Sequence, residues 1–319
     1  MDAGHWGPRP PIRDEKVGSS QKGRFVATKS LRARLTPFGY LSPTLLLMCV
    51  LMATPIVMVI GYSFMNNVIM TKNSYGVGFA NYVSVFTDDV FYQALLNTAI
   101  FTIGSVVIHM VLGMFFALLL NSKAISAFTR AFFRVIYVLP WVFTAAIIAI
   151  LWRMLLDPSG VVNYLLNTLG IIHGPVAWLG STDTAIWALL LINVWAGYPF
   201  YMVSMLATMQ GIPTELYEAA RVDGATAGQQ FLHVTLPSMR PILLSLGTLD
   251  FIWTMQQFPL VWMTTGGGPI HATEMLSTYT YKLAFNKYSF SMASTSAVIV
   301  LALSMVLAAV YTRVQKAGD

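Results

Sequence analysis

Long apolar runs separated by short polar segments dominate the hydrophobicity pattern of this chain. A membrane-spanning helix needs about 20 predominantly apolar residues, and six stretches of the chain reach that length. The pattern therefore predicts an all-α polytopic membrane protein with six transmembrane helices. The six predicted spans are residues 38–65, 91–120, 132–156, 184–210, 242–264 and 289–311.

The first 34 residues have a different character from the rest of the chain. They are polar and rich in Gly, Pro, Ser and basic residues, a composition that favours disorder. We therefore divide the chain into a disordered cytosolic tail, residues 1–34, and a transmembrane domain, residues 35–319. The apolar run after the tail is too long for the core of a signal peptide, so we interpret the first span as an uncleaved signal anchor.

Composition supports the membrane assignment and excludes several other classes. The chain is 56% hydrophobic and 10% charged, with a mean hydropathy of +0.65, which is not the composition of a soluble domain. It has a single cysteine, Cys49. A disulfide within the chain and a cysteine metal site are therefore both excluded.

The distribution of positive charge predicts the orientation of the chain. The net charge of +6 could suggest a nucleic-acid ligand, but eight of the 19 basic residues lie in the first 34 positions. With a cytoplasmic N-terminus, 15 basic residues fall inside and only Lys72, Arg153, Lys282 and Lys287 fall outside. This asymmetry is a membrane orientation signal. It predicts cytoplasmic N- and C-termini and no nucleic-acid partner.

The most charged segment after the tail is residues 213–241, which this orientation places in the cytoplasm between spans four and five. Its residue types predict a helix, a break and a second helix. Thr214 can cap the first helix. Asp223-Gly224 can end it, because glycine tolerates the positive φ that a helix end requires.

The second short helix also has recognisable end signals. Thr226 and Gln229 have the spacing of a capping box, in which each side chain bonds the other residue's backbone. Pro237 is predicted to end this helix. The expected product is an L-shaped pair of short helices at the membrane surface, although an ordinary cytoplasmic loop with two amphipathic turns would have a similar pattern.

The same segment carries a set of acidic, small and apolar residues at characteristic spacing: Glu218-Ala219-Ala220, Asp223-Gly224-Ala225, Phe231, Leu236-Pro237 and Pro241. These residues resemble the EAA signature of ABC importer permeases. In that family the small residues let the helix pair dock closely into a cleft of a cytoplasmic ATPase. The resemblance therefore implies an ATPase-coupling role for Glu218, Ala219, Ala220, Asp223, Gly224 and Phe231.

The resemblance extends over most of the chain, from about residue 41 to residue 311, and is closest to the maltose-type, first-subunit permeases. Further matching motifs are Leu139-Pro140, Asp157-Pro158, Trp178-Leu179, Ile212-Pro213 and Thr265-Gly-Gly-Gly-Pro269. Membership would imply a sugar importer in the bacterial inner membrane that works by alternating access. It would also imply a second six-span permease, two ATPase subunits that bind ATP and magnesium, and an extracytoplasmic sugar-binding protein.

Polar residues in the fifth span mark a candidate solute site. Asp250, Thr254 and Gln257 are spaced i, i+4 and i+7, so they share one helical face, and Trp253 lies beside them. Ionisable residues inside membranes are expensive and usually face the bundle interior. A carboxylate and an amide can bind sugar hydroxyls, and an indole can cover the apolar face of a pyranose.

The fourth span adds three candidates through the resemblance. In maltose-type permeases, the positions that match Asn193, Gly197 and Phe200 line the sugar site together with those that match Asp250, Thr254 and Gln257. Phe200 replaces a tyrosine, so one hydroxyl contact would be missing. The alternative is that these polar groups only satisfy one another between helices, which is common for small polar residues.

Two other functions remain open at this stage. A secondary carrier driven by protons or sodium could use Asp250 and His109 as a relay, but we find none of the internal repeats that such carriers often contain. His109 has no acidic residue in its own span, so we expect a structural role. We interpret Trp141, Trp152 and Trp195 as interface or packing residues.

A membrane enzyme is the second of these other functions. The sequence contains no evident nucleophile–base pair or metal cluster and no Gly-x-x-x-x-Gly-Lys phosphate-binding loop. We therefore expect a chain that is not an enzyme and has no cofactor or metal of its own.

The outer loop at residues 157–183 is long for a simple connection. A short amphipathic helix on the outer surface is predicted from Val161, Tyr164, Leu165, Thr168 and Leu169. This helix could only seal the bundle, or it could form part of a docking surface for an external binding protein, and the sequence favours neither.

Overall fold

The computed structural model describes residues 31–66, 68–70, 73–122 and 124–316. Within these ranges the regular structure is helical, apart from one isolated antiparallel bridge between Met65 and Gly76, so the predicted all-α class is confirmed. The predicted tail lies outside the described residues as far as residue 30, and the first helix already begins at Leu31, before the predicted boundary at residue 35.

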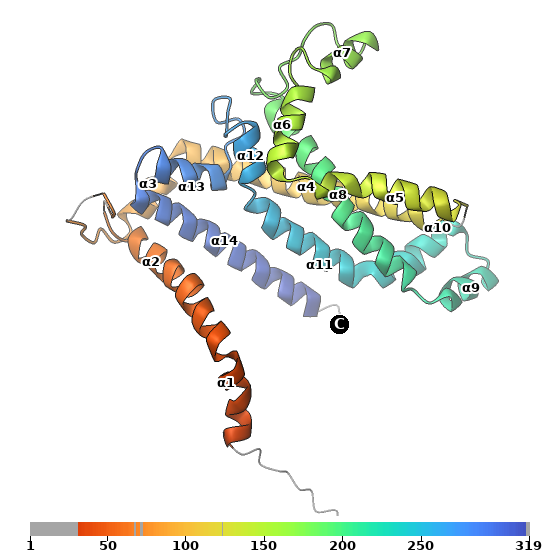
Figure 1. Cartoon of the computed structure of the whole chain (residues 1–319), viewed down its shortest axis with the longest axis horizontal. Coiled ribbons are helices and arrows are strands. Elements are labelled where there is room, and N and C mark those ends of the chain that lie inside the picture. Colours follow the sequence, from red (N-terminus) through yellow and green to blue (C-terminus); the bar gives the residue numbers. More distant parts are fainter. Residues whose placement is uncertain (1–30, 67, 71–72, 123, 317–319) are drawn as a thin grey trace, which may run out of the picture. The chain divides into compact units, whose positions relative to one another are not determined.

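Figure 1 shows the described helices. In chain order they are α1 Leu31–Met48, α2 Thr54–Ser63, α3 Ala80–Phe86, α4 Asp89–Asn121, α5 Ala127–Val142, α6 Ala145–Leu155, α7 Val161–Thr168, α8 Ala185–Gln210, α9 Thr214–Val222, α10 Ala227–Gln230, α11 Leu236–Met255, α12 Pro259–Thr264, α13 Leu276–Phe285 and α14 Phe290–Lys316. Residues 55–319 form one unit, and the helix contacts and pockets described below lie within it.

Four described helices are long and apolar enough to cross a membrane, and they correspond to predicted spans one, two, four and six. They are Tyr40–Ser63, Asp89–Asn121, Ala185–Gln210 and Phe290–Ala309. The pair α5–α6 also qualifies, although it is bent by 99°. The described residues thus contain four or five of the six predicted spans.

The third predicted span, residues 132–156, is not a continuous helix. Helix α5 contains Pro140 and ends at Val142, after which Phe143 is extended with φ −75° and ψ 143°. Thr144 then caps a new helix by accepting a hydrogen bond from the Ile147 amide. Since proline removes a helical donor and Thr favours a cap, the apolar run folds into two helices that meet at a steep angle (Figure 1).

The fifth predicted span, residues 242–264, is also interrupted, so its prediction as one helix is wrong. Helix α11 ends at Met255, and α12 begins at Pro259. Pro259 has no N–H to continue the α11 hydrogen-bond ladder, and the Gln257 amide instead bonds the carbonyl of Thr254 at 3.1 Å. The apolar run at residues 242–264 is continuous in hydropathy, so hydropathy alone does not predict this break.

Helices α4 and α8 pack side by side through glycine. A Cβ added to Gly113 of α4 would lie 2.4 Å from Tyr201 Cβ and 3.0 Å from the backbone nitrogen of Met202. Small residues let membrane helices approach closely and gain van der Waals contact. Buried side chains around this contact include Met205 and Met239.

The N-terminal part of α4 is tied to the loop that follows α12. Asn97 donates hydrogen bonds to the backbone oxygens of His271 and Glu274, each at 3.0 Å. The fully buried Glu274 carboxylate pairs with Lys282 Nζ at 2.5 Å and His271 Nδ1 at 3.0 Å. Gly267 lies directly against this cluster, since a Cβ there would be 2.8 Å from both carboxylate oxygens.

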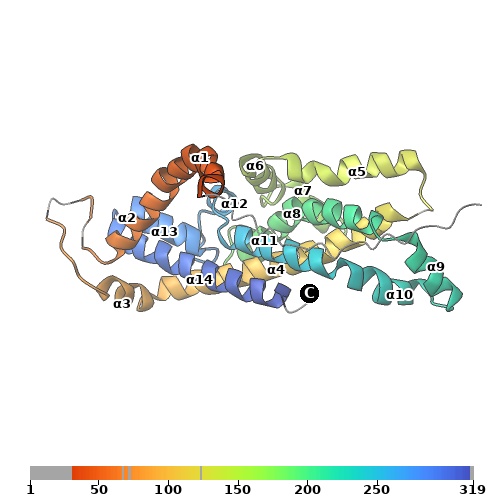
Figure 2. The same cartoon turned by 90° about the horizontal axis from the view of Figure 1, so that it is seen from below.

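A second tie joins α13 to the N-terminus of α4. Tyr279 donates to Asp88 Oδ2 at 2.8 Å, and Asp88 also caps α4 by accepting from the Val90 amide at 2.9 Å. Burial raises the pKa of the Tyr279 phenol, and the neighbouring Asp88 acts in the same direction, so the phenol remains a donor at neutral pH. Helices α12 and α13 lie towards the opposite end of α4 and α8 from α9 (Figures 1 and 2).

We predict that Gly113→Ala lowers the thermal midpoint of the detergent-purified protein. The added methyl group meets the backbone of α8, and overpacking of this kind costs ~1–3 kcal/mol, more than the ~0.5–1 kcal/mol that Ala gains over Gly in a helix. Gly61→Ala is the matched control, because a Cβ at Gly61 has no atom within 4 Å. Equal midpoints for the two variants would contradict the proposed close contact.

Candidate functional site

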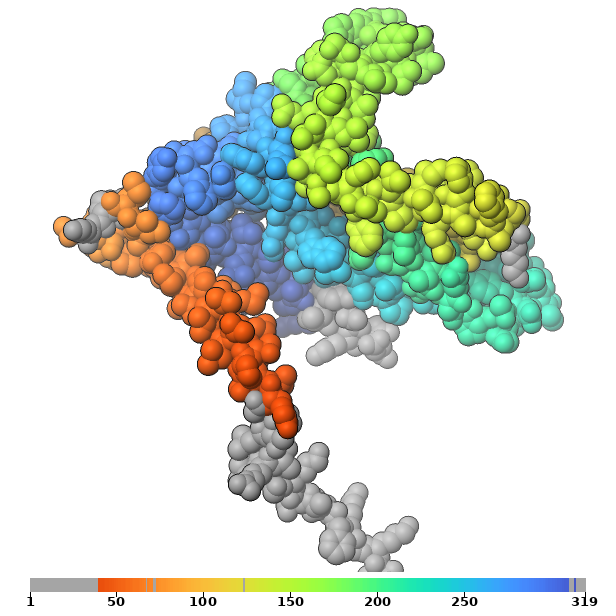
Figure 3. Space-filling model, in the orientation of Figure 1, coloured from red at the N-terminus to blue at the C-terminus, as the bar shows by residue number. Residues whose placement is uncertain are grey.

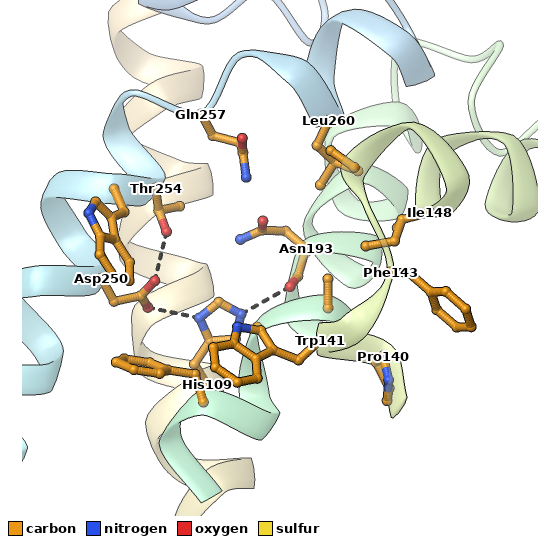
Figure 4. A pocket seen from close by; sticks show the side chains of 15 residues that line it. His109, Pro140, Trp141, Phe143, Ile148, Asn193, Asp250, Thr254, Gln257 and Leu260 are labelled. Atoms are coloured by element: carbon orange, nitrogen blue, oxygen red, sulfur yellow. Dashed lines mark hydrogen bonds and ion pairs between the residues drawn. The ribbon is translucent and has the colours of Figure 1, made fainter. Parts of the chain in front are cut away.

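The seven predicted solute-site residues all line one pocket, although the break in the fifth span was not predicted. The pocket has a volume of about 250 Å³, and Figure 4 shows the side chains that surround it. Helices α4, α5, α6, α8, α11 and α12 all contribute to its lining. The predicted residues in the lining are Asn193, Gly197, Phe200, Asp250, Trp253, Thr254 and Gln257.

His109 and Asp250 form a buried pair at the centre of the hydrogen-bond network beside the pocket. His109 Nδ1 of α4 lies 2.8 Å from Asp250 Oδ2 of α11, and His109 Nε2 lies 3.0 Å from the backbone oxygen of Asn193 in α8 (Figure 4). His109 is 2% exposed and Asp250 is 8% exposed. His109 has no acidic residue in its own span, as expected, and its acidic partner comes instead from α11, 141 residues further along the chain.

Asp250 makes two further hydrogen bonds. Tyr201 donates to Oδ2 at 3.1 Å, and Thr254 donates to Oδ1 at 3.0 Å. Both carboxyl oxygens therefore have protein partners, as a buried carboxyl group requires. Asp250 thus has hydrogen-bond partners on other helices, as the alternative of mutually satisfied polar groups also expects.

Gly197 makes room for the histidine ring. A Cβ added at Gly197 would lie 2.3 Å from His109 Nε2 and 2.4 Å from its Cε1. The glycine therefore acts on the pocket through His109, and any larger residue would displace the ring from Asp250.

An aromatic strip forms another side of the pocket. The ring of Phe200 lies 6.1 Å from that of Trp141 and 5.9 Å from that of Trp253, centroid to centroid. Both indoles are more than half exposed, at 55% and 59%. Trp141 was predicted to be an interface or packing residue, and its place in the pocket was not predicted. The rings of Trp152 and Trp195 do pack edge to face, with their centroids 5.6 Å apart.

The Gln257 side-chain amide and the Asn193 side-chain oxygen remain available for a ligand. The Asn193 side-chain nitrogen donates to Ser105 at 2.9 Å, which leaves its Oδ1 without a partner among the described residues. The Gln257 side chain likewise has no partner in the described part of the chain, and its amide projects into the pocket (Figure 4). The pocket thus combines free amides with aromatic faces, the chemistry that binds polyols.

The predicted helix–break–helix at residues 213–241 is present. The break forms a Schellman motif, in which Gly224 N–H bonds the Arg221 oxygen at 3.0 Å and Ala225 N–H bonds the Ala220 oxygen at 2.9 Å. Gly224 adopts φ +80°, the left-handed conformation that this motif requires. The capping box of Thr226 and Gln229 is also present.

Pro237 does not end the second helix, contrary to the prediction. Helix α10 continues through a π-helical turn, Phe231–Thr235, into α11, which contains Pro237. The Leu236 amide bonds the Phe231 oxygen, five residues back. A π-turn shifts the hydrogen-bond register, so the helix accommodates the proline and continues.

The segment is exposed and includes apolar side chains. Glu218, Ala219, Asp223 and Gly224 are exposed, whereas Ala220 and Phe231 are partly buried. Three large apolar side chains are also exposed: Leu216 at 47%, Val222 at 88% and Leu232 at 57%.

The predicted outer helix is present as α7, and its apolar face is exposed. Val161, Tyr164, Leu165 and Leu169 are each more than half exposed, while Asn163 points inward and bonds the oxygens of Asp157 and Val176 at 2.9 Å. In the space-filling view, the yellow-green segment that contains α6 and α7 projects from its neighbours (Figure 3).

A second cavity lies between the segment that follows α6 and the loop that follows α12. A groove of about 420 Å³ lies between residues 153–180 and residues 264–269. Asp157 contributes to its rim, and hydrogen bonds from Ser159 lower the pKa of this carboxyl group, which keeps it charged.

The described residues contain no group of three or more His, Cys, Asp or Glu side chains that could hold a metal ion. Cys49 is exposed and free.

Comparison with known proteins identifies the family. The family model described as "Binding-protein-dependent transport system inner membrane component" matches residues 109–317. A probable ABC transporter permease protein of Bacillus subtilis is 35% identical over 76% of this chain and 83% of its own length. A trehalose/maltose transport system permease protein of Thermococcus litoralis is 32% identical over 90% of this chain and 96% of its own.

A solved structure supports the fold. One chain of a bacterial ABC transporter involved in the import of the acidic polysaccharide alginate superposes with a TM-score of 0.77, over 90% of this chain and 97% of that chain, at 23% identity. No finding supports an ion-coupled carrier, and the family supplies the membrane component rather than an enzyme. The chain therefore belongs to the binding-protein-dependent transport system inner membrane components, and it is a permease subunit of an ABC importer.

Proposed function

We propose that this chain lines half of a sugar translocation pathway and that the pocket between α8 and α11 is where the sugar binds. One observation carries the proposal: the free amide of Gln257 and Oδ1 of Asn193 lie beside the aromatic strip of Trp141, Phe200 and Trp253. Amides bind hydroxyls, and indole rings cover the apolar faces of sugar rings. The trehalose/maltose permease among the relatives supports the same substrate class.

Residues 213–241 are proposed to transmit the ATPase cycle to the pocket. The Schellman turn at Gly224 sets the angle between α9 and the following helix, and the exposed Leu216 and Val222 supply an apolar contact surface. Residues Glu218, Ala219, Ala220, Asp223, Gly224 and Phe231 form this coupling surface in our proposal. The chain itself binds no cofactor, and ATP with magnesium binds the ATPase subunits.

The proposed assembly is a heterodimer with a second six-span permease, two cytoplasmic ATPase subunits and an extracytoplasmic sugar-binding protein in the bacterial inner membrane. The binding protein docks on the outer groove near Asp157 and on the exposed face of α7. In this arrangement both termini are cytoplasmic. Helices α11 and α12 form the fifth of six membrane spans as an interrupted span, which is tolerated where the break lines a cavity.

We predict that Trp253→Ala weakens the apparent affinity for the transported sugar roughly twofold to tenfold, because aromatic contacts contribute ~0.5–1.5 kcal/mol. Trp253 is exposed to the pocket, so the thermal midpoint should not change. Sugar uptake kinetics in proteoliposomes measure the effect. Trp187→Ala is the matched control, since Trp187 is also 60% exposed on α8 but does not line the pocket; an equal effect in both variants would argue against the site.

We predict that Gly224→Leu abolishes sugar-stimulated ATP hydrolysis, because the left-handed turn is strained for any side chain and the added bulk separates the coupling surface from the ATPase. Gly78→Leu is the matched control, with φ +58° and open space around its Cβ position, as at Gly224. Copurification of the ATPase and its hydrolysis rate are the measurements. Wild-type coupling in Gly224→Leu would refute the coupling role.

The orientation can be tested with single cysteines after Cys49→Ala. The exposed residues Thr182 and Glu215 lie in the proposed outer loop and in the proposed cytoplasmic helix α9. In spheroplasts, an impermeant maleimide should label Thr182→Cys directly. It should label Glu215→Cys only after the inner membrane is permeabilised. The reverse pattern would invert the proposed topology.

A further inference from the structure

The hydrogen bonds around His109 define the charge of the His109–Asp250 pair. Nδ1 faces the carboxyl group of Asp250, and Nε2 faces the backbone oxygen of Asn193. A neutral imidazole donates from only one nitrogen. Both contacts are therefore satisfied by an imidazolium beside a carboxylate, or by an Nε2–H tautomer whose Nδ1 accepts from a protonated carboxyl. In both arrangements the pair holds one shared proton and has no net charge.

The remaining neighbours of the pair are neutral. Tyr201 and Thr254 donate to Asp250 through hydroxyl groups at 3.1 and 3.0 Å. Among the residues that line the pocket, His109 and Asp250 are the only ones with acidic or basic side chains. The charge of this chain's half of the pocket therefore depends on the pair alone.

The pair also has a fixed position. It joins three helices, because His109 lies on α4, Asp250 on α11 and the Asn193 carbonyl on α8. Gly197 lies against the histidine ring on the side where a Cβ would collide with it. Separation of the partners would leave an uncompensated charge in a buried site, which is strongly unfavourable.

We propose that His109 is a positioning and specificity-determining residue: by neutralising Asp250, it makes this chain's half of the pocket selective for uncharged sugars over amino sugars and uronic acids. The inference rests on the proposed function of the pocket. The solute contacts the free amides and the aromatic strip, while the His109–Asp250 pair holds the geometry and excludes net charge. A free carboxylate at Asp250 would instead attract a cationic solute.

Binding to the detergent-purified permease–ATPase complex tests the proposal. The uncharged probe is whichever of maltose, trehalose and diacetylchitobiose binds with the highest affinity, and the charged probes are amino-sugar and uronic-acid analogues of the same disaccharide. Equilibrium dialysis gives the affinity ratio of amino sugar to uncharged sugar. The wild-type complex should prefer the uncharged probe to both charged analogues.

His109→Gln keeps a hydrogen-bonding group near Asp250 but removes the imidazole that shares a proton with it. The ratio should then shift towards the amino sugar by roughly tenfold, because no basic partner balances the charge of the Asp250 carboxyl group. His109→Gln combined with Asp250→Asn has neither charge and should return the ratio towards the wild-type value. His173→Ala is the matched histidine control, since His173 is exposed in the outer loop, and its ratio should equal that of the wild type.

An unchanged ratio in folded His109→Gln, or the same shifted ratio in the double variant, would overturn the proposal, since a structural histidine would change stability without changing charge selectivity. If His109→Gln fails to assemble, the double variant should recover assembly with the ATPase, and failure of both would also overturn it. Sugar uptake by the wild-type complex is a separate result: no uptake or binding of any sugar would refute the proposed function, whereas equal affinity for charged and uncharged sugars would refute only this inference.

Discussion

The contact of His109 with Gly197 and Asp250 is the constraint on which the pocket depends. It requires α4 and α8 to approach closely, which Gly113 and Gly197 allow, and it requires the α11 carboxylate to reach the same point. Inside a membrane, close packing and polar contacts rather than hydrophobic segregation specify how helices associate. The close helix packing and the His109–Asp250 contact therefore occur at the same place. Loss of either one would separate the helices that line the pocket.

Interrupted helices make the pocket accessible to a ligand. The break between α5 and α6 brings Trp141 and Phe143 to the pocket, and the break between α11 and α12 exposes Gln257. Irregular backbone at membrane depth is tolerated where it lines a cavity, and binding sites of transporters commonly use such breaks. The two predicted spans that proved discontinuous are thus the ones that shape the site.

The elements that the sequence predicted well are those governed by local rules. The Gly224 turn and the Thr226 capping box depend on residues within one helical turn, so their types and spacing are sufficient. The seven predicted residues that line one pocket were chosen from helical periodicity and family resemblance. His109 and Asp250 were paired only in the alternative of a carrier relay, because they are 141 residues apart and no pattern in either span predicts their contact. The breaks at Phe143 and Gln257 were concealed for a different reason, since hydropathy measures polarity and not helical continuity.

Chain connectivity joins the helices of residues 213–241 to the pocket. Helix α8 carries Asn193, Gly197 and Phe200 and is about 39 Å long at 1.5 Å per residue; only a short connection separates its end from α9. Helix α11 carries Asp250 and Thr254 and is continuous with α10 through the π-turn. The two short helices at the Gly224 break are thus each joined to one wall of the pocket. A change in the angle between α9 and α10 would act on both walls together, and the His109–Asp250 pair lies where those walls meet.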